Sequence, residues 1–206
     1  MRKYFKIACL IAVILAIAVF LTGCSNKNES KTYKFYESII NNDEYLIKIE
    51  GDIEVEEGQR ENGTVTIAKK GDNMFVSTHT VSSSASVINK EDTTYILLDS
   101  EKLYVTTQRD RNEEDNNIFF EKEDIEKLKE QTYVNGKEEI DGVEYEYEEY
   151  DTEDGGKIKY CFEGNTLKYV KEILNEQEDT SKILEATNNV SDSIFEVPSD
   201  YTEANF

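Results

Sequence analysis

Tryptophan is absent from the 206-residue sequence, and proline and histidine each occur once. The single histidine, His79, cannot supply a multi-histidine zinc site, and the sequence contains neither an HExxH nor a CxxC pattern. No serine or cysteine nucleophile motif accompanies His79, which is therefore interpreted as an ordinary strand residue. We expect no enzyme, no catalytic residues, no metal site and no cofactor.

Cysteine is also scarce, with Cys9, Cys24 and Cys161 the only three. Because Cys9 and Cys24 belong to the first 24 residues, Cys161 stands alone in the remainder and has no partner for an intrachain disulfide. A domain of about 180 residues buries enough surface to fold without such bonds. A strand position explains Cys161 better than a reactive thiol does.

Basic residues are few: 23 lysines and arginines stand against 44 aspartates and glutamates. Three of the basic residues precede Cys24, which leaves 20 basic against 44 acidic residues, a balance of −24. Nucleic acids and anionic lipid headgroups attract basic surfaces, so this balance argues against both as binding partners. The acidic excess indicates solubility and repulsion beside a negative membrane, with cation binding as the alternative.

The N-terminus combines a short cationic segment with the apolar run Ile7 to Leu21. About fifteen residues are fewer than the roughly twenty that a membrane-spanning helix needs, which favours a signal peptide. The run ends in Leu21-Thr22-Gly23-Cys24, and polar residues follow. This tetrapeptide resembles the lipobox of bacterial lipoproteins, and the resemblance implies cleavage before Cys24 and a diacylglyceryl group on its thiol. An ordinary secretory signal with a chance cysteine is the alternative.

Three segments follow from this interpretation. We predict a signal peptide at residues 1–23, the lipidated Cys24 with a polar tether over residues 24–31, and a single β domain at residues 32–206. The lipid anchor would hold the domain at the extracytoplasmic face of the cell membrane. Two acyl chains, at about 0.8 kcal/mol per buried methylene, anchor a protein without a spanning helix.

From Glu44 onward the hydrophobic pattern changes to the period of two that is typical of strands. We predict strands at 45–56, 64–69, 73–82, 85–89, 93–98, 102–107, 143–147, 157–162, 166–174 and 180–187, and helices at 32–40 and 121–131. The segment from Glu57-Gly58 to Asn62-Gly63 carries turn chemistry, and its Asn-Gly pair is a strong hairpin signal. Such close spacing favours an antiparallel meander, because a parallel crossover needs about a dozen residues.

Two strands predict how their faces are used. Residues 93–98 (TTYILL) are apolar on both sides, so we expect both faces of that strand to be covered. In the strand at 143–147, Tyr145 and Tyr147 alternate with Glu144 and Glu146, which predicts an aromatic inner face and an acidic wet face.

The predicted fold class is mainly β (α+β): a curved antiparallel sheet or half-barrel of about nine to eleven strands with a few short helices. An initial helix, a Tyr-rich strand, the meander and the closing segment Phe195-Glu196-Val197-Pro198-Ser199-Asp200-Tyr201 resemble the LolA/LolB-like fold, which includes mycobacterial glycolipid-binding lipoproteins. The resemblance spans residues 32–201 and is one of pattern. It implies a half-barrel around a hydrophobic cavity for acyl chains.

Thirteen tyrosines and nine phenylalanines are the remaining signal. On the apolar faces of strands, such side chains either fill a core or line a cavity. The candidate cavity residues are Tyr45, Ile47, Ile49, Tyr145, Tyr147, Tyr160 and Phe162. Two functions follow: a lipoprotein that binds or carries a lipid or another hydrophobic ligand, or an envelope protein-interaction or sensory module with a filled core and no small ligand.

Overall fold

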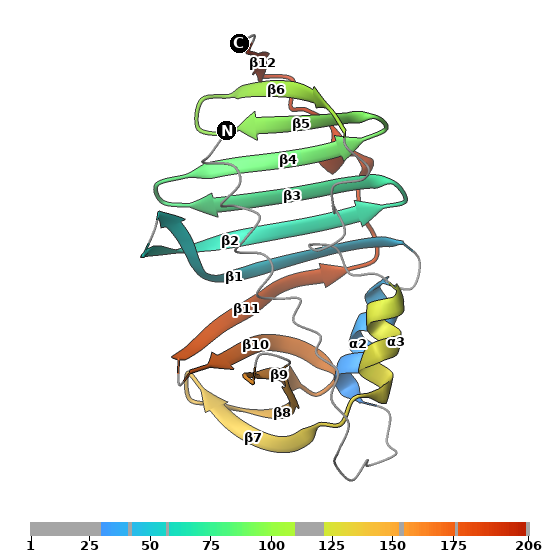
Figure 1. The fold of residues 1–206 in the computed structure, drawn as a ribbon, viewed down its shortest axis with the longest axis vertical. Coiled ribbons are helices and arrows are strands. Elements are labelled where there is room, and N and C mark those ends of the chain that lie inside the picture. Colours follow the sequence, from blue (N-terminus) through green and yellow to red (C-terminus); the bar gives the residue numbers. More distant parts are fainter. Residues whose placement is uncertain are drawn as a thin grey trace. The chain divides into compact units, whose positions relative to one another are not determined.

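The computed structural model describes residues 30–40, 43–56, 58–109, 122–152, 155–175 and 177–204 (Figure 1). The predicted signal peptide, Cys24 and all but the last two residues of the tether lie outside these residues. Within the described ranges, no helix combines the length and the apolar character that crossing a membrane requires.

The chain groups into two compact units, which are described separately. Unit 1 takes its described residues from 1–41 and 120–183, and unit 2 takes them from 42–119 and 184–206. Unit 1 contains α2 (Lys31–Ile40), α3 (Lys122–Glu130), β7 (Val134–Ile140), β8 (Val143–Asp151), β9 (Lys157–Glu163), β10 (Thr166–Leu174) and most of β11 (Gln177–Thr187). Unit 2 contains β1 (Glu44–Glu56), β2 (Gln59–Lys70), β3 (Asn73–Thr80), β4 (Ser84–Lys90), β5 (Thr93–Leu98), β6 (Leu103–Gln108), the 3-10 helix η3 (Asp192–Phe195) and β12 (Thr202–Glu203).

The strands follow the order β12-β6-β5-β4-β3-β2-β1-β11-β10-β9-β8-β7. The hairpin neighbours pair antiparallel, and the two-residue β12 runs parallel to β6. The predicted mainly β class, built from an antiparallel meander with short helices, is therefore confirmed.

The turn predicted between Glu57-Gly58 and Asn62-Gly63 is correct at Gly58 and wrong at Asn62-Gly63. These residues lie inside β2, where Gly63 is opposite Gly51, and the two strands join through the turn that contains Gly58. Gly63 serves close approach instead, because a Cβ there would lie 2.5 Å from the carbonyl oxygen of His79 on β3. An Asn-Gly pair thus carries a turn signal even where a strand needs its glycine for packing.

In unit 1, α2 packs one side against the sheet. Tyr33, Tyr36, Ile39 and Ile40 are buried on this side, and the ring of Tyr36 lies edge-on to Tyr160 of β9 at 5.9 Å. The two helices also pack together, with Ile125 and Leu128 of α3 buried. The helix predicted at 121–131 is therefore present as α3 and buries these two apolar residues.

The β8–β9 register decides which side of the hairpin faces these helices. Glu148 pairs with Tyr160, and Tyr150 pairs with Ile158, so these four side chains share one face. We call this side of β7–β10 the helix face. The sequence predicted that the even-numbered glutamates of β8 would be its wet side. Glu144 and Glu146 are exposed as predicted, but Glu148 is 4% exposed on the helix face, and Tyr145 and Tyr147 are half-buried on the opposite face.

In unit 2, one face of the meander is sealed by the C-terminal segment (residues 188–201). Val190 and Phe195 of this segment form a buried cluster with Ala68, Ile88 and Leu97 of the sheet. Partly buried side chains pack around the cluster: Leu46, Phe75, Tyr95, Tyr104, Ile194, Val197 and Tyr201. The segment predicted to close the chain is thus part of the core of unit 2.

Candidate functional site

The seven predicted cavity residues do not share one face. Tyr45, Ile47 and Ile49 lie on β1 in unit 2, and each is at most 3% exposed. Tyr160 and Phe162 are buried on the helix face of β9 in unit 1. Tyr145 and Tyr147 are half-buried on the other face of the same hairpin.

An apolar row crosses unit 2 on the face opposite the C-terminal segment. The strand register places five branched side chains directly opposite one another: Ile67, Val76, Val87, Ile96 and Val105. A parallel row contains Val65, Thr78, Ala85, Leu98 and Leu103. We call these two rows the apolar face. With neighbouring strands about 4.8 Å apart, each row runs about 19 Å across β2–β6.

The apolar face is only partly covered. Ile67 is 1% exposed, whereas Val76, Val87, Ile96 and Val105 are all half-buried. The sequence predicted that both faces of residues 93–98 would be covered, and this is wrong: Leu97 is the single buried residue of β5. Apart from Thr78, the side chains of this face offer no hydrogen bonds, so the face suits apolar material, at about 25 cal/mol per Å² buried.

Unit 1 presents a different open side. Its members by register are Glu138, Tyr145, Tyr147, Glu149, Lys159, Cys161, Tyr169 and Lys171. Glu138 of β7 bonds Lys171 of β10, three strands away. Three strand spacings are about 14 Å in a flat sheet, and side chains stand perpendicular to it, so this contact requires a sheet curled toward these residues. We call this side the concave face; Figure 1 shows β7 and β10 arching around β8 and β9.

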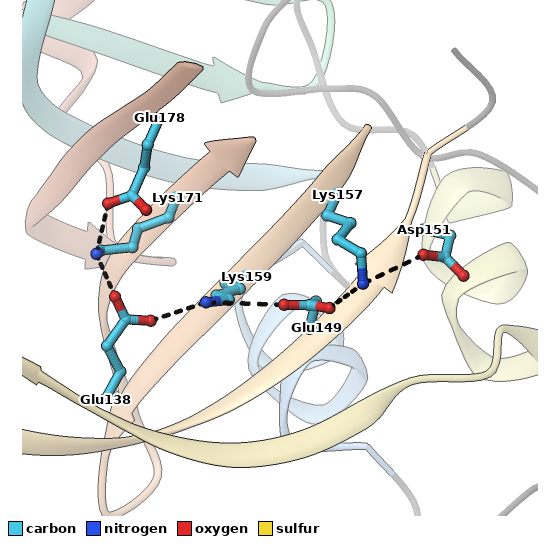
Figure 2. A network of polar contacts seen from close by, with 7 residues as sticks. All are labelled: Glu138, Glu149, Asp151, Lys157, Lys159, Lys171 and Glu178. Atoms are coloured by element: carbon cyan, nitrogen blue, oxygen red, sulfur yellow. Dashed lines mark hydrogen bonds and ion pairs between the residues drawn. The ribbon is translucent and has the colours of Figure 1, made fainter. Parts of the chain in front are cut away.

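A chain of ion pairs fills the concave face (Figure 2). It alternates in charge: Asp151, Lys157, Glu149, Lys159, Glu138, Lys171 and Glu178. Glu138 lies 3.1 Å from Lys159, and Lys171 lies 2.7 Å from Glu178. The side chain of Lys171 is only 9% exposed. An acyl chain placed here would have to bury these charges beside hydrocarbon, which is unfavourable.

The titration of this face follows from its contacts. Burial would raise the pKa of Glu138, but hydrogen bonds from Lys171 and Lys159 outweigh it and hold that pKa below its usual range. For Lys171, the bonds to Glu138 and Glu178 outweigh burial and raise its pKa. Burial raises the pKa of the Cys161 thiol to about 11, so this cysteine stays protonated and unreactive at neutral pH.

An open pocket of about 560 Å³ lies in unit 1 beside the start of α2. Of the predicted residues, Tyr147 and Phe162 contribute to its lining; the others are Lys31, Asn135, Gly136, Lys137, Glu146 and Glu148. Its charged groups already have partners, since Lys31 bonds Glu146 and Lys137 bonds Glu144 at 2.6 Å.

Glu148 anchors the first helix. Its carboxylate accepts hydrogen bonds from the backbone N–H groups of Lys31 and Thr32, at 2.7 and 2.9 Å, at the positive end of α2. It also accepts from the hydroxyls of Ser30, Thr32 and Tyr150. Burial and the charge of Glu148 raise the pKa of Tyr150. Sequence reasoning missed Glu148 because it lies among other glutamates of the same strand with no distinguishing pattern.

Metal-ligating side chains do not converge in the described ranges, where no group of three or more histidine, cysteine, aspartate or glutamate residues could hold an ion. His79 is exposed and its Nδ1 lies 3.0 Å from the Oγ of Ser84. Ser84 donates in turn to Asp99, a carboxylate that also accepts from Tyr201. This group holds the C-terminal segment against the sheet.

No protein-family model matches the sequence, and neither does any curated protein. Among solved structures, the chain is similar to a conserved protein from Thermus thermophilus, with 8% identity and a TM-score of 0.47 over 85% of this chain and 99% of that one. It is also similar to a LolA superfamily protein from Nitrosomonas europaea, with 10% identity and a TM-score of 0.32 over 82% of this chain and 98% of that one.

A structural neighbour thus bears the superfamily name that the sequence pattern resembles. With TM-scores and identities this low, neither likeness says what this chain binds. The assignment as a lipoprotein stays a prediction, since Cys24 lies outside the described residues.

Proposed function

We propose that this chain is a lipoprotein, held at the extracytoplasmic face of the cell membrane through Cys24, whose unit 2 binds a lipid acyl chain or a similar hydrophobic ligand. The binding surface is the apolar face. The anchor supplies proximity to the lipid, because a protein held at the bilayer meets acyl chains at high local concentration.

The main support for a hydrophobic ligand is the row of side chains from Ile67 to Val105. Five branched aliphatic side chains stand in register across five strands, and four of them keep part of their surface accessible. Its length of about 19 Å suits an extended hydrocarbon chain better than a compact ring system. The opposite face of the same strands is already occupied by the C-terminal segment.

The concave face of unit 1 supports the same assignment by contrast. A half-barrel that held acyl chains there would need an apolar lining, whereas this one carries the ion pairs of Glu138, Lys159 and Lys171. The proposed ligand therefore lies away from the predicted cavity residues of unit 1, such as Tyr145 and Tyr147, and against aliphatic residues of β2–β6 in unit 2.

Ligand binding is tested by native mass spectrometry of residues 25–206, before and after organic extraction. An extra mass that matches a lipid and disappears on extraction supports the proposal. The double variant Val87→Thr/Ile96→Thr keeps β-branched side chains but makes the apolar face polar, and it should retain less of that mass. The matched control, Thr66→Val/Ser77→Val, alters the other face of β2 and β3 and should retain all of it.

A clean apo mass, with no uptake when phospholipid or glycolipid is offered, would reject the ligand and favour an envelope protein-interaction module. The anchor is tested separately in bacteria that produce the full chain. We expect the chain in the membrane fraction with a diacylglyceryl-modified N-terminal peptide that begins at Cys24. Cys24→Ser should abolish both the modification and processing at this site; unchanged processing would identify an ordinary secretory signal instead.

A further inference from the structure

Two lysines of the ion-pair chain share a single carboxylate. The Nζ of Lys159 donates to Oε2 of Glu138 at 3.1 Å, and the Nζ of Lys171 donates to its Oε1 (Figure 2). Each carboxylate oxygen therefore has its own ammonium partner. The side chains of Lys159, Lys171 and Glu138 are 16%, 9% and 20% exposed, so these charges lie largely out of water on the concave face.

The lysines and the glutamate come from different parts of unit 1. Lys159 and Lys171 are on the paired strands β9 and β10, directly opposite each other. Glu138 belongs to β7, the last strand in the sheet order, which pairs with β8. The neighbouring Lys137 bonds Glu144 and so stays within the β7–β8 hairpin. Glu138 instead crosses the hairpin to reach β9 and β10.

The contacts that would remain without Glu138 show what the two lysines would lose. Without Glu138, Lys159 would keep Glu149 at 3.7 Å, and Lys171 would keep Glu178 at 2.7 Å. Each ammonium would then retain one carboxylate, but the space between them would have lost the anion that both bond. A poorly solvated ammonium group favours any anion that fills this space.

We propose that Lys159 and Lys171 form a binding site for a small oxyanion, either a carboxylate or a phosphate group, and that Glu138 fills this site in cis. Glu138 acts as a tethered ligand, and the tether is the edge strand β7. An external anion that takes the site displaces Glu138 and releases β7 from β9 and β10. By linkage, any change that loosens β7 strengthens anion binding by the same factor.

The test is chemical rescue of Glu138→Ala in residues 25–206, which contain every described residue. This variant removes the carboxylate and leaves space between the lysines. We expect a lower thermal midpoint than wild type, and saturable recovery of at least half of the loss on titration with sodium formate. Sodium chloride at equal ionic strength should not restore it. Parallel titration with inorganic phosphate decides between the carboxylate and the phosphate class.

Three variants make the result specific. Glu138→Gln keeps the space filled, so it should lose stability without recovery in formate. Glu144→Ala removes the partner of the exposed Lys137 and should show no dependence on formate. The double variant Glu138→Ala/Lys171→Met lacks half of the site and should not recover. Equal recovery with chloride, in Glu138→Gln or in the double variant, would overturn the proposal.

If Glu138→Ala does not fold, the wild-type chain is titrated with inorganic phosphate and followed by amide NMR. We expect chemical-shift changes centred on Lys159 and Lys171, together with faster hydrogen exchange of the amides of β7 that pair with β8. Unchanged spectra up to the solubility limit of phosphate would overturn the proposal.

Discussion

The apolar face of unit 2 and the concave face of unit 1 are both open sides of antiparallel strands, yet their chemistry is opposite. In unit 2 the row from Ile67 to Val105 contains only branched aliphatic side chains. In unit 1 the corresponding positions carry the alternating charges from Asp151 to Glu178. The alternation of residue types along a strand therefore separates two faces but does not determine which of them becomes the interior.

The difference should also appear in what holds each unit together. Unit 2 is held together by apolar packing, because the side chains of Phe195 and Val190 complete its buried core. Unit 1 adds buried polar groups, since Glu148 fixes α2 and Glu138 closes the curl of the sheet. Apolar burial is insensitive to salt and to mild acid, whereas ion pairs are sensitive to both.

The largest effect is expected in the core of unit 2. Phe195→Ala should lower the free energy of unfolding by about 4 kcal/mol, because a ring that is 2% exposed leaves a cavity. Urea unfolding measures the change, which should be the same at low and high salt. Val81→Ala is the control: its side chain is 95% exposed, and its loss should be within about 0.5 kcal/mol of zero. Equal losses in both variants would contradict the packing of residues 188–201.

In unit 1, Glu148→Ala should have the next largest effect. It should cost about 3 kcal/mol, because two backbone N–H groups and three hydroxyls lose their buried acceptor. Urea unfolding gives the magnitude, and amide exchange at Lys31 and Thr32 locates it. Glu148→Gln keeps one acceptor oxygen and should lose about half as much. Unaltered exchange at the start of α2 would show that Glu148 does not anchor the helix.

Much of the fold, but little of the site, could be predicted from the sequence. Strands such as 93–98 and 166–174 were located correctly because their apolar runs end at turn residues. The strand β7 was missed, since its sequence VNGKEEI shows little alternation. Its Gly136 has a partner that no local pattern reveals: a Cβ there would lie 2.4 Å from Cζ and from the hydroxyl oxygen of Tyr147.

On β8 the prediction failed at Glu148 for a related physical reason, whereas Glu144 and Glu146 are exposed as predicted. A tyrosine suits either an inner or an outer face, and a glutamate is buried when donors await it, as Ser30 and Lys31 do for Glu148. Those donors lie more than a hundred residues away in the sequence. Residues 93–98 did carry a signal for the apolar face, because their sequence is apolar on both sides of the strand.

Breaking the ion-pair chain should have an intermediate effect. Lys171→Met removes the least exposed lysine of the chain and should cost about 2 kcal/mol, since Glu138 and Glu178 each lose a partner. Adding Glu138→Leu should recover part of the loss, because it removes the less exposed of the two carboxylates that lose Lys171. A double-mutant cycle by urea unfolding measures the coupling. Strict additivity of the two changes would contradict the contact.

A smaller effect should appear with acid. The folded pKa of Glu138 lies below its unfolded value, so its stabilisation is complete above the unfolded pKa of about 4.3 and is lost as pH falls through the folded one. The difference in free energy of unfolding between wild type and Glu138→Gln should therefore be constant near pH 7 and shrink below about pH 5. The other carboxylates titrate in both proteins, so their contributions cancel in the difference between the two free energies of unfolding. A difference that stays constant to pH 3 would contradict the assignment.

The smallest effect is expected at Lys137, which bonds Glu144 much as Lys171 bonds Glu178, with similar distances of 2.6 and 2.7 Å. The environments differ: the Lys137 side chain is 61% exposed and that of Lys171 is 9% exposed. Water and salt screen an exposed pair, so Lys137→Met should leave the urea midpoint unchanged within error. The contrary outcome is that Lys137→Met lowers the urea midpoint as much as Lys171→Met does. The burial that the curled sheet gives Lys171 would then add nothing to the strength of its ion pairs.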